Sequence, residues 1–236
     1  MLVTARPPRW VDALASGLAC HAVTICENGA LVYDAAAHVV LEEHPIDPRD
    51  ASGLVARLRE ALPGCTFAVE RSDGFGHEPG YATFWPIPPG ALVDQAEALV
   101  AGPVTKLLAR AAPGTSPAGL LERAAAAVGT LGEVSMSSNA GLVEVAARGV
   151  SKATALKGVL AELGVRPEEV IAFGDMLNDL PMLALAGWSV AVANAHPAVR
   201  AIADEVTAAC GEDGVARVLE RVVGAGPGAD ASLSRA

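Results

Sequence analysis

The stretch Val170-Ile171-Ala172-Phe173-Gly174-Asp175-Met176-Leu177-Asn178-Asp179-Leu180-Pro181 changes from apolar to acidic at Gly174. The apolar run before the glycine is typical of a buried strand, and the residues after Asp179 favour a helix. Ligands of open α/β sheets bind at the carboxyl ends of the strands, which is where this pattern places Asp175. Asp175, Asn178 and Asp179 supply two carboxylates and an amide oxygen, which suit Mg²⁺ beside a phosphate.

The same residues also fit an ordinary helix start. Asn or Asp before a helix, with proline in the first turn, is common capping chemistry. Asn178-Asp179-Leu180-Pro181 has this pattern. The stretch by itself therefore leaves two interpretations open, a metal site and a helix cap.

The composition is that of a globular protein. The chain has 236 residues, of which 52% are hydrophobic and 19% charged, which is enough for one large or two modest domains. The formal net charge of -10 argues against nucleic acid or an anionic membrane as a partner, because both require a basic surface. A small acidic metabolite is compatible, because a local metal ion or lysine can outweigh the global charge.

The cysteines and histidines show no metal-binding pattern. Cys20, Cys26, Cys65 and Cys210 have no CxxC spacing, and the five histidines are scattered. Both patterns favour packing or surface positions over a zinc site. Unpaired cysteines favour a reduced, cytoplasmic environment. No apolar run reaches transmembrane length, and the first residues lack the basic and then apolar pattern of a signal peptide.

Three segments are predicted along the chain. Residues 1–33 predict a strand end at Leu2-Val3, a helix over residues 10–18, and a hairpin signalled by Asn28-Gly29. Residues 34–142 predict an α/β insert with a largely antiparallel sheet. The strands expected in this insert are residues 38–43, 65–71, 104–109 and 133–137. The expected helices are residues 51–62, 91–101 and 117–128. Residues 73–86, rich in aromatic and turn residues, fit either a mobile lid or a loop folded over its own small core.

The βα pattern returns at residues 142–146. A helix is predicted from Ser151, a good cap, to residue 163, then a strand over residues 189–192 and helices over residues 197–203 and 214–223. Lys152 in a first helical turn is unfavourable for the helix dipole, which indicates an anionic group opposite it, although a solvated lysine is the alternative. The Gly-, Ala- and Ser-rich residues 224–236 predict a disordered tail.

Four motifs stand in one order: Val3-Thr4-Ala5-Arg6, Glu27-Asn28-Gly29-Ala30, Gly149-Val150-Ser151-Lys152 and Gly174-Asp175-Met176-Leu177-Asn178-Asp179. Together they resemble the haloacid dehalogenase superfamily, specifically its Cof-type phosphatases with a large α/β cap. The resemblance implies an α/β fold in which residues 1–33 and 143–223 form a core domain with a Rossmann-like parallel sheet. Residues 34–142 would form the inserted cap domain.

The resemblance also implies roles for individual residues. Thr4 matches the hydroxyl that hydrogen-bonds the transferring phosphoryl group, and Lys152 matches the lysine that neutralises its charge. Asp175 matches the main Mg²⁺ ligand, while Asn178 and Asp179 match residues that support the ion or orient Lys152. Further candidates for lining the pocket are Arg6, Asn28 and Asn194.

One motif of the superfamily is absent, because no Asp-x-Asp-Gly-Thr run occurs in the 236 residues. In the superfamily its first aspartate attacks phosphorus and forms an aspartyl phosphate, and its second protonates the leaving group. We therefore expect negligible hydrolysis by this chain alone. Met1 falls inside what resembles the second core strand, so we expect a missing first strand, loop and helix of about 30 to 40 residues upstream. Apolar edges at Leu2-Val3 and residues 170–173 favour a truncated reading frame over a natural pseudoenzyme.

The function expected from this resemblance is a Mg²⁺-dependent phosphomonoesterase. Its substrate would be a small phosphorylated metabolite, in the first instance a sugar phosphate, and its nucleophile would lie upstream of this chain. The alternatives are a non-catalytic protein that binds a phosphorylated ligand and a sugar phosphomutase.

Overall fold

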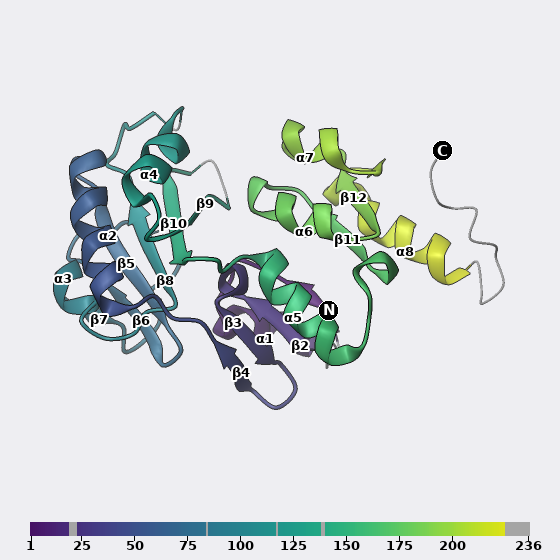
Figure 1. Ribbon diagram of the computed structural model, residues 1–236, viewed down its shortest axis with the longest axis horizontal. Helices are drawn as coiled ribbons and strands as arrows, with labels where there is room; N and C mark the ends of the chain where they lie inside the picture. Colours follow the sequence, from purple (N-terminus) through teal and green to yellow (C-terminus); the bar gives the residue numbers. More distant parts are fainter. Residues whose placement is uncertain (19–22, 84, 117, 138–139, 225–236) are drawn as a thin grey trace. The chain divides into compact units, whose positions relative to one another are not determined.

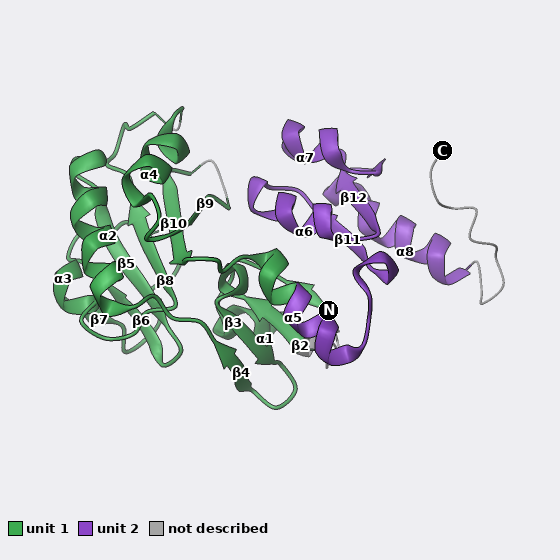
Figure 2. Cartoon of the chain, viewed as in Figure 1, with its two compact units in different colours: residues 1–156 green, residues 157–236 purple. Residues whose placement is uncertain are grey.

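The computed structural model describes residues 1–18, 23–83, 85–116, 118–137 and 140–224. The chain divides into two compact units, unit 1 with residues 1–156 and unit 2 with residues 157–236 (Figure 2). Cys20 and all of the predicted tail except Gly224 lie outside the described residues. In the part of the chain that the structure describes, no helix is long and apolar enough to cross a membrane.

The first sheet of unit 1 has the strand order β1-β2-β3-β4. Its strands are β1 (Leu2–Val3), β2 (Val23–Cys26), β3 (Leu31–Asp34) and β4 (Val39–Glu43). Helix α1 (Pro8–Leu18) connects β1 to β2, which pair in parallel, whereas β3 and β4 follow as antiparallel strands. The carboxyl ends of β1 and β2 therefore lie at the same edge of this sheet.

The hairpin predicted at Asn28-Gly29 is confirmed. Strands β2 and β3 pair antiparallel, and a short 3-10 turn, η1 (Glu27–Gly29), connects them. Asn28 has φ +61° and Gly29 has φ +106°, conformations that favour asparagine and glycine in a tight hairpin.

The second sheet of unit 1 has the order β7-β6-β5-β8-β10-β9 and is antiparallel except for the β6–β7 pair. Its strands are β5 (Thr66–Arg71), β6 (Gly74–His77), β7 (Leu92–Val93), β8 (Lys106–Arg110), β9 (Gly132–Ser135) and β10 (Leu142–Ala147). Helices α2 (Pro48–Ala61), α3 (Ala96–Leu99) and α4 (Leu120–Val128) pack with it (Figure 1).

The two faces of this sheet differ in chemistry. The helices share one apolar core with Phe67, Val69, Leu107 and Val145 of the central strands. Side chains alternate between faces along a strand, so the neighbouring positions point to the opposite face. That face carries the smaller apolar cluster of Ala68, Phe75, Tyr81 and Leu108, together with buried charged residues.

Two parts of the predicted insert differ from expectation. The helix expected over residues 91–101 is reduced to α3, because residues 92–93 pair with β6 as strand β7. Pairing with another segment overrides the local helix preference. Strand β4 pairs with β3 in the first sheet, and β10 pairs with β8 and β9 in the second. Periodicity does not reveal which sheet a strand joins. The domain boundaries 1–33, 34–142 and 143–223 stay a prediction.

Helix α5 (Lys152–Leu163) begins in unit 1, and unit 2 then forms a three-stranded parallel sheet. The strands, in sheet order, are β11 (Ile171–Gly174), β12 (Trp188–Val192) and β13 (Glu205–Thr207). The remaining helices are α6 (Leu180–Leu185), α7 (Pro197–Ile202) and α8 (Gly214–Gly224), with 3-10 turns η2 (Pro167–Glu169), η3 (Leu177–Asp179) and η4 (Cys210–Glu212). The predicted strand, turn and helix around Asp175 are thus confirmed.

Candidate active site

In unit 1 the loops that follow β1 and β2 lie side by side. The Asn28 amide donates to the Thr4 carbonyl oxygen at 3.0 Å, and the Glu27 amide donates to the Arg6 carbonyl oxygen at 3.1 Å. The Thr4 hydroxyl accepts the Arg6 amide at 3.1 Å, which closes a local turn. Three of the predicted site residues, Thr4, Arg6 and Asn28, therefore share one edge of the first sheet.

A close backbone approach adds the start of α5 to this edge. A Cβ on Gly29 would lie 2.3 Å from the Ser151 carbonyl oxygen, so only glycine allows the contact. Ser151 caps the helix as predicted: its hydroxyl accepts the Thr154 amide at 3.2 Å, and its amide donates to the Thr154 hydroxyl at 2.9 Å. Lys152, the next residue, is buried, so the solvated-lysine alternative does not hold.

A buried ionic network joins these loops to the second sheet. The Lys106 ammonium donates to the Ala5 carbonyl oxygen at 2.7 Å and to Glu144 Oε2 at 3.1 Å. Glu144 also accepts from Asn28 Nδ2 at 2.9 Å and from the Ser137 hydroxyl. Burial by itself raises the pKa of Glu144, but the Lys106 charge and these hydrogen bonds outweigh it and hold that pKa below its ordinary value. Glu144 is therefore ionised at neutral pH.

Glu27 is a second buried acid beside this network. It is fully buried, and neither carboxyl oxygen has a hydrogen-bond partner among the described residues. Burial and the neighbouring Glu70 carboxylate raise the pKa of Glu27 to about 7, although the Lys106 and Arg9 charges oppose the shift. Glu70 itself is held by Arg9 through two hydrogen bonds of 2.7 and 2.9 Å.

In unit 2 the acidic loop after β11 is organised by Asp179. Its Oδ2 accepts the amides of Asp175 at 2.9 Å and Met176 at 3.0 Å, and its side chain is buried. A Cβ on Gly174 would lie 2.7 Å from the Asp179 Cβ, so the strand must end in glycine for the carboxylate to fold back. Asp179 therefore shapes the loop that presents Asp175, which is exposed.

The donor atoms of this loop fit Mg²⁺. Asp175 supplies an exposed carboxylate and Asn178 an amide oxygen, and Mg²⁺ commonly takes one or two carboxylates while keeping several waters. Among the described residues no group of three or more His, Cys, Asp or Glu side chains is arranged for a metal. The donor set suits a hard ion shared with a phosphate and does not suit zinc.

Asn194 lies in the loop after β12. Its Oδ1 accepts the Cys210 amide at 2.8 Å, and two residues on, the His196 amide donates to the Asp175 carbonyl oxygen at 2.8 Å. Unit 1 thus brings together Thr4, Arg6, Asn28 and Lys152, and unit 2 contains Asp175, Asn178, Asp179 and Asn194.

The sequence interpretation missed the buried acids Glu27, Glu70 and Glu144, although it named Asn28 and Lys106, two partners of Glu144, as candidates for substrate binding. Glu144 interrupts the otherwise apolar strand β10, whereas Glu70 lies near the end of β5 and Lys106 begins β8. A lone charge inside such a strand indicates a buried pair, because an unpaired charge is costly to bury. The partner of each charge comes from a distant segment, which the spacing does not reveal.

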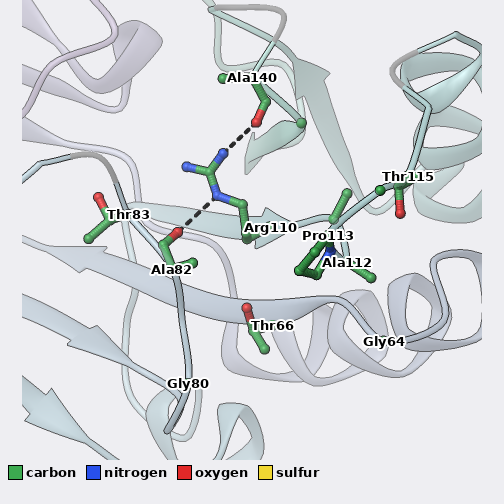
Figure 3. A pocket seen from close by; sticks show the side chains of 13 residues that line it. Gly64, Thr66, Gly80, Ala82, Thr83, Arg110, Ala112, Pro113, Thr115 and Ala140 are labelled. Carbon is green, nitrogen blue, oxygen red and sulfur yellow. Dashed lines mark hydrogen bonds between the residues drawn. The ribbon is translucent and has the colours of Figure 1, made fainter.

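A separate cavity of about 460 Å³ lies in unit 1 beside the end of β8 (Figure 3). Arg110 donates from Nε to the Ala82 carbonyl oxygen at 3.0 Å and from Nη1 to the Ala140 carbonyl oxygen at 2.7 Å. Arg110 ends the strand that Lys106 begins, so about 13 Å separates the two backbone positions. The cavity therefore lies toward the other end of β8 from the loops around Thr4.

Fold and loop geometry together define an α/β protein whose polar motif residues lie in the loops after the strands. A family model for haloacid dehalogenase-like hydrolases matches residues 1–219. The chain belongs to this family, as the motifs predicted. The fold class is confirmed as well: a sugar phosphatase of subclass IIB of the superfamily shares the fold, with 18% identity, a TM-score of 0.75, and coverage of 94% of this chain and 84% of that one.

Two curated relatives match shorter segments. A phosphoglycolate phosphatase of Methanothermobacter thermautotrophicus is 44% identical over 75 residues, 32% of this chain and 34% of the relative. A 5-amino-6-(5-phospho-D-ribitylamino)uracil phosphatase of Bacillus subtilis is 46% identical over 79 residues, 34% of this chain and 29% of the relative. The matched segments thus span about a third of each relative's length.

A solved structure of similar fold covers most of the chain. It is a haloacid dehalogenase-like hydrolase of Bacillus subtilis, 22% identical, with a TM-score of 0.75 over 93% of this chain and 86% of that one. At this identity the likeness concerns the fold alone.

Proposed function

We propose that this chain carries the metal-binding and phosphate-binding part of a Mg²⁺-dependent phosphomonoester hydrolase. The observation that carries the proposal is the meeting of three motif loops, those of Thr4, Asn28 and Lys152, at one edge of the first sheet. Membership of the hydrolase family supports it. The names of the curated relatives, both phosphatases of small metabolites, favour a small phosphorylated substrate such as a sugar phosphate.

Each residue has a role in this proposal. The Thr4 hydroxyl donates to a phosphoryl oxygen, and the Lys152 ammonium neutralises charge that develops on the phosphoryl group. Asp175 and Asn178 hold Mg²⁺, and Asp179 fixes their loop. A bound Mg²⁺ would lower the negative charge that an attacking nucleophile meets. Arg6, Asn28 and Asn194 line the surroundings of the phosphate.

The nucleophile of this proposal is an aspartate outside residues 1–236, which becomes an aspartyl phosphate before water releases phosphate. The missing Asp-x-Asp-Gly-Thr run motivates it. Among the described strands, β1 pairs with β2 alone and β11 with β12 alone, each in parallel. Each strand therefore has one edge at which a further strand can pair.

The missing motif also favours a second candidate, a protein that binds a phosphorylated ligand without turning it over. For either candidate we propose a cytoplasmic location, in keeping with the free thiols of Cys26, Cys65 and Cys210.

Phosphate release from p-nitrophenyl phosphate with Mg²⁺ separates the candidates. We would compare residues 1–236 with a longer chain that carries an upstream Asp-x-Asp-Gly-Thr motif. Turnover by the longer chain alone is expected for the hydrolase. Binding of phosphate by both chains without turnover by either would favour the binding protein, and the absence of both binding and turnover would contradict the two candidates together.

A further inference from the structure

The ionic network touches the backbone at the middle of the first motif. Ala5 lies between Thr4 and Arg6, and its carbonyl oxygen accepts the Lys106 ammonium. The carboxylate that pairs with this ammonium also accepts the Asn28 side-chain amide. One buried ion pair of the second sheet therefore contacts both loops that carry proposed site residues.

We propose that Lys106 and Glu144 are positioning residues, by which strands β8 and β10 fix the loops of Thr4 and Asn28 for phosphate binding. Neither side chain needs to touch the substrate in this role. The inference rests on the proposed function, because phosphate binding is what the two positioned loops would serve. The effect of the ion pair on the loops can be measured whether or not the chain binds phosphate.

Register and burial explain why this pair lies on the loop side of the sheet. Lys106 is opposite Glu70, and Glu144 is opposite Leu108, so all four share the face that the helices leave uncovered. The Lys106 and Glu144 side chains are 5% and 3% exposed. Charged hydrogen bonds to a backbone carbonyl and an amide are short, directional and little screened at such burial, so they restrict the loops more than apolar packing would.

The charges that face Lys106 keep the ammonium protonated. Burial alone lowers the pKa of Lys106, but the carboxylates of Glu144, Glu27 and Glu70 outweigh burial and raise it. An isolated buried pair is often no more stabilising than an apolar replacement. The network is therefore better explained by its effect on the orientation of the two loops than by a gain in folding stability. An experiment can separate these two effects.

The test uses residues 1–236 with the double change Lys106→Met/Glu144→Gln, which removes both charges and so leaves neither buried without its partner. The matched control is Arg59→Met/Glu78→Gln, an ion pair between helix α2 and the residue after β6, whose Glu78 carboxylate accepts the Phe67 and Ala96 amides. Two quantities are measured for each variant. The first is the rate of hydrogen exchange at the backbone amides of Glu27 and Asn28. The second is the affinity for inorganic phosphate with Mg²⁺, measured by calorimetry.

We expect the double variant to exchange the Glu27 and Asn28 amides about tenfold faster than the parent, with amides of α2 unchanged. Phosphate affinity should fall by a similar factor, and the control should leave both quantities as in the parent. Unchanged exchange at the two amides would overturn the proposal. Equal acceleration throughout unit 1 would also overturn it, because that result describes a general loss of stability.

The single change Glu144→Gln covers the case in which the double variant fails to fold. This variant keeps the hydrogen bond from Lys106 to the Ala5 carbonyl oxygen. The backbone amide of Asn28 should therefore exchange faster than in the parent, and the backbone amide of Glu27 should not. Equal exchange rates in variant and parent would overturn the proposal. If the parent itself binds no phosphate, the proposed function fails, and the exchange rates still decide whether the pair positions the loops.

Discussion

Asn28 donates its side-chain amide to Glu144 at 2.9 Å, across 116 positions of sequence. The contact joins the turn after β2 to strand β10 of the second sheet. Because the Glu144 carboxylate is ionised and can only accept, the amide nitrogen must face it. The orientation of a proposed ligand-binding side chain in the first sheet is thus set by a strand of the second.

The buried acid Glu27 makes stability depend on pH. Its folded pKa of about 7 lies above the ordinary value of 4.5, so the stability it contributes is fully present below about pH 4.5 and is lost as the pH rises through 7. The shift corresponds to about 3 kcal/mol. We expect urea denaturation of the parent to show a falling free energy of unfolding from pH 5 to pH 8. In Glu27→Gln this fall should be smaller by that amount, and identical pH slopes would contradict the assignment.

Gly174→Ala should disrupt the acidic loop. The added Cβ would lie 2.7 Å from the Asp179 Cβ, so the carboxylate can no longer cap the two amides. We expect a loss of about 1–3 kcal/mol in the free energy of unfolding, measured by chemical denaturation. Gly158→Ala is the matched control, because its Cβ meets nothing within 4 Å in α5 and alanine there should stabilise by up to about 1 kcal/mol. Equal effects of the two changes would refute this account of Gly174.

Asp175 and Asp179 should respond differently to neutralisation. Asp179→Asn weakens the bonds to the Asp175 and Met176 amides and should cost about 1–3 kcal/mol of stability. Asp175→Asn changes an exposed side chain, so stability should stay within about 0.5 kcal/mol while Mg²⁺-dependent phosphate binding is lost. Denaturation and calorimetry on both variants check this, and retained Mg²⁺ dependence in Asp175→Asn would exclude it as the ligand.

Lys152→Ala should weaken phosphate binding by about tenfold or more, because a charge-assisted contact to the anion is removed. Lys157→Ala, on the exposed side of the same helix, should leave the affinity unchanged. Calorimetric titration with inorganic phosphate and Mg²⁺ compares the two. The same phosphate affinity in both variants would contradict the phosphate-binding role of Lys152.

Several local elements and the family were predictable from the amino-acid sequence. Apolar runs ending in Gly174, the Asn28-Gly29 pair and the Ser151 cap each depend on neighbours within a few residues, so their strand, hairpin and helix start were predicted and are confirmed. Backbone conformation and capping are short-range effects, and they are readable wherever the chain is locally consistent.

Contacts between residues far apart in sequence could be seen in the folded chain alone. The sheet membership of β4 and β10, the close approach of Gly29 to Ser151, and the burial of Glu27 depend on strand pairing between segments far apart in sequence. A charged residue in an apolar strand shows that a partner is needed but not which one. Pairing is set by the long-range packing that buries both charges together, and spacing along the chain carries no record of it.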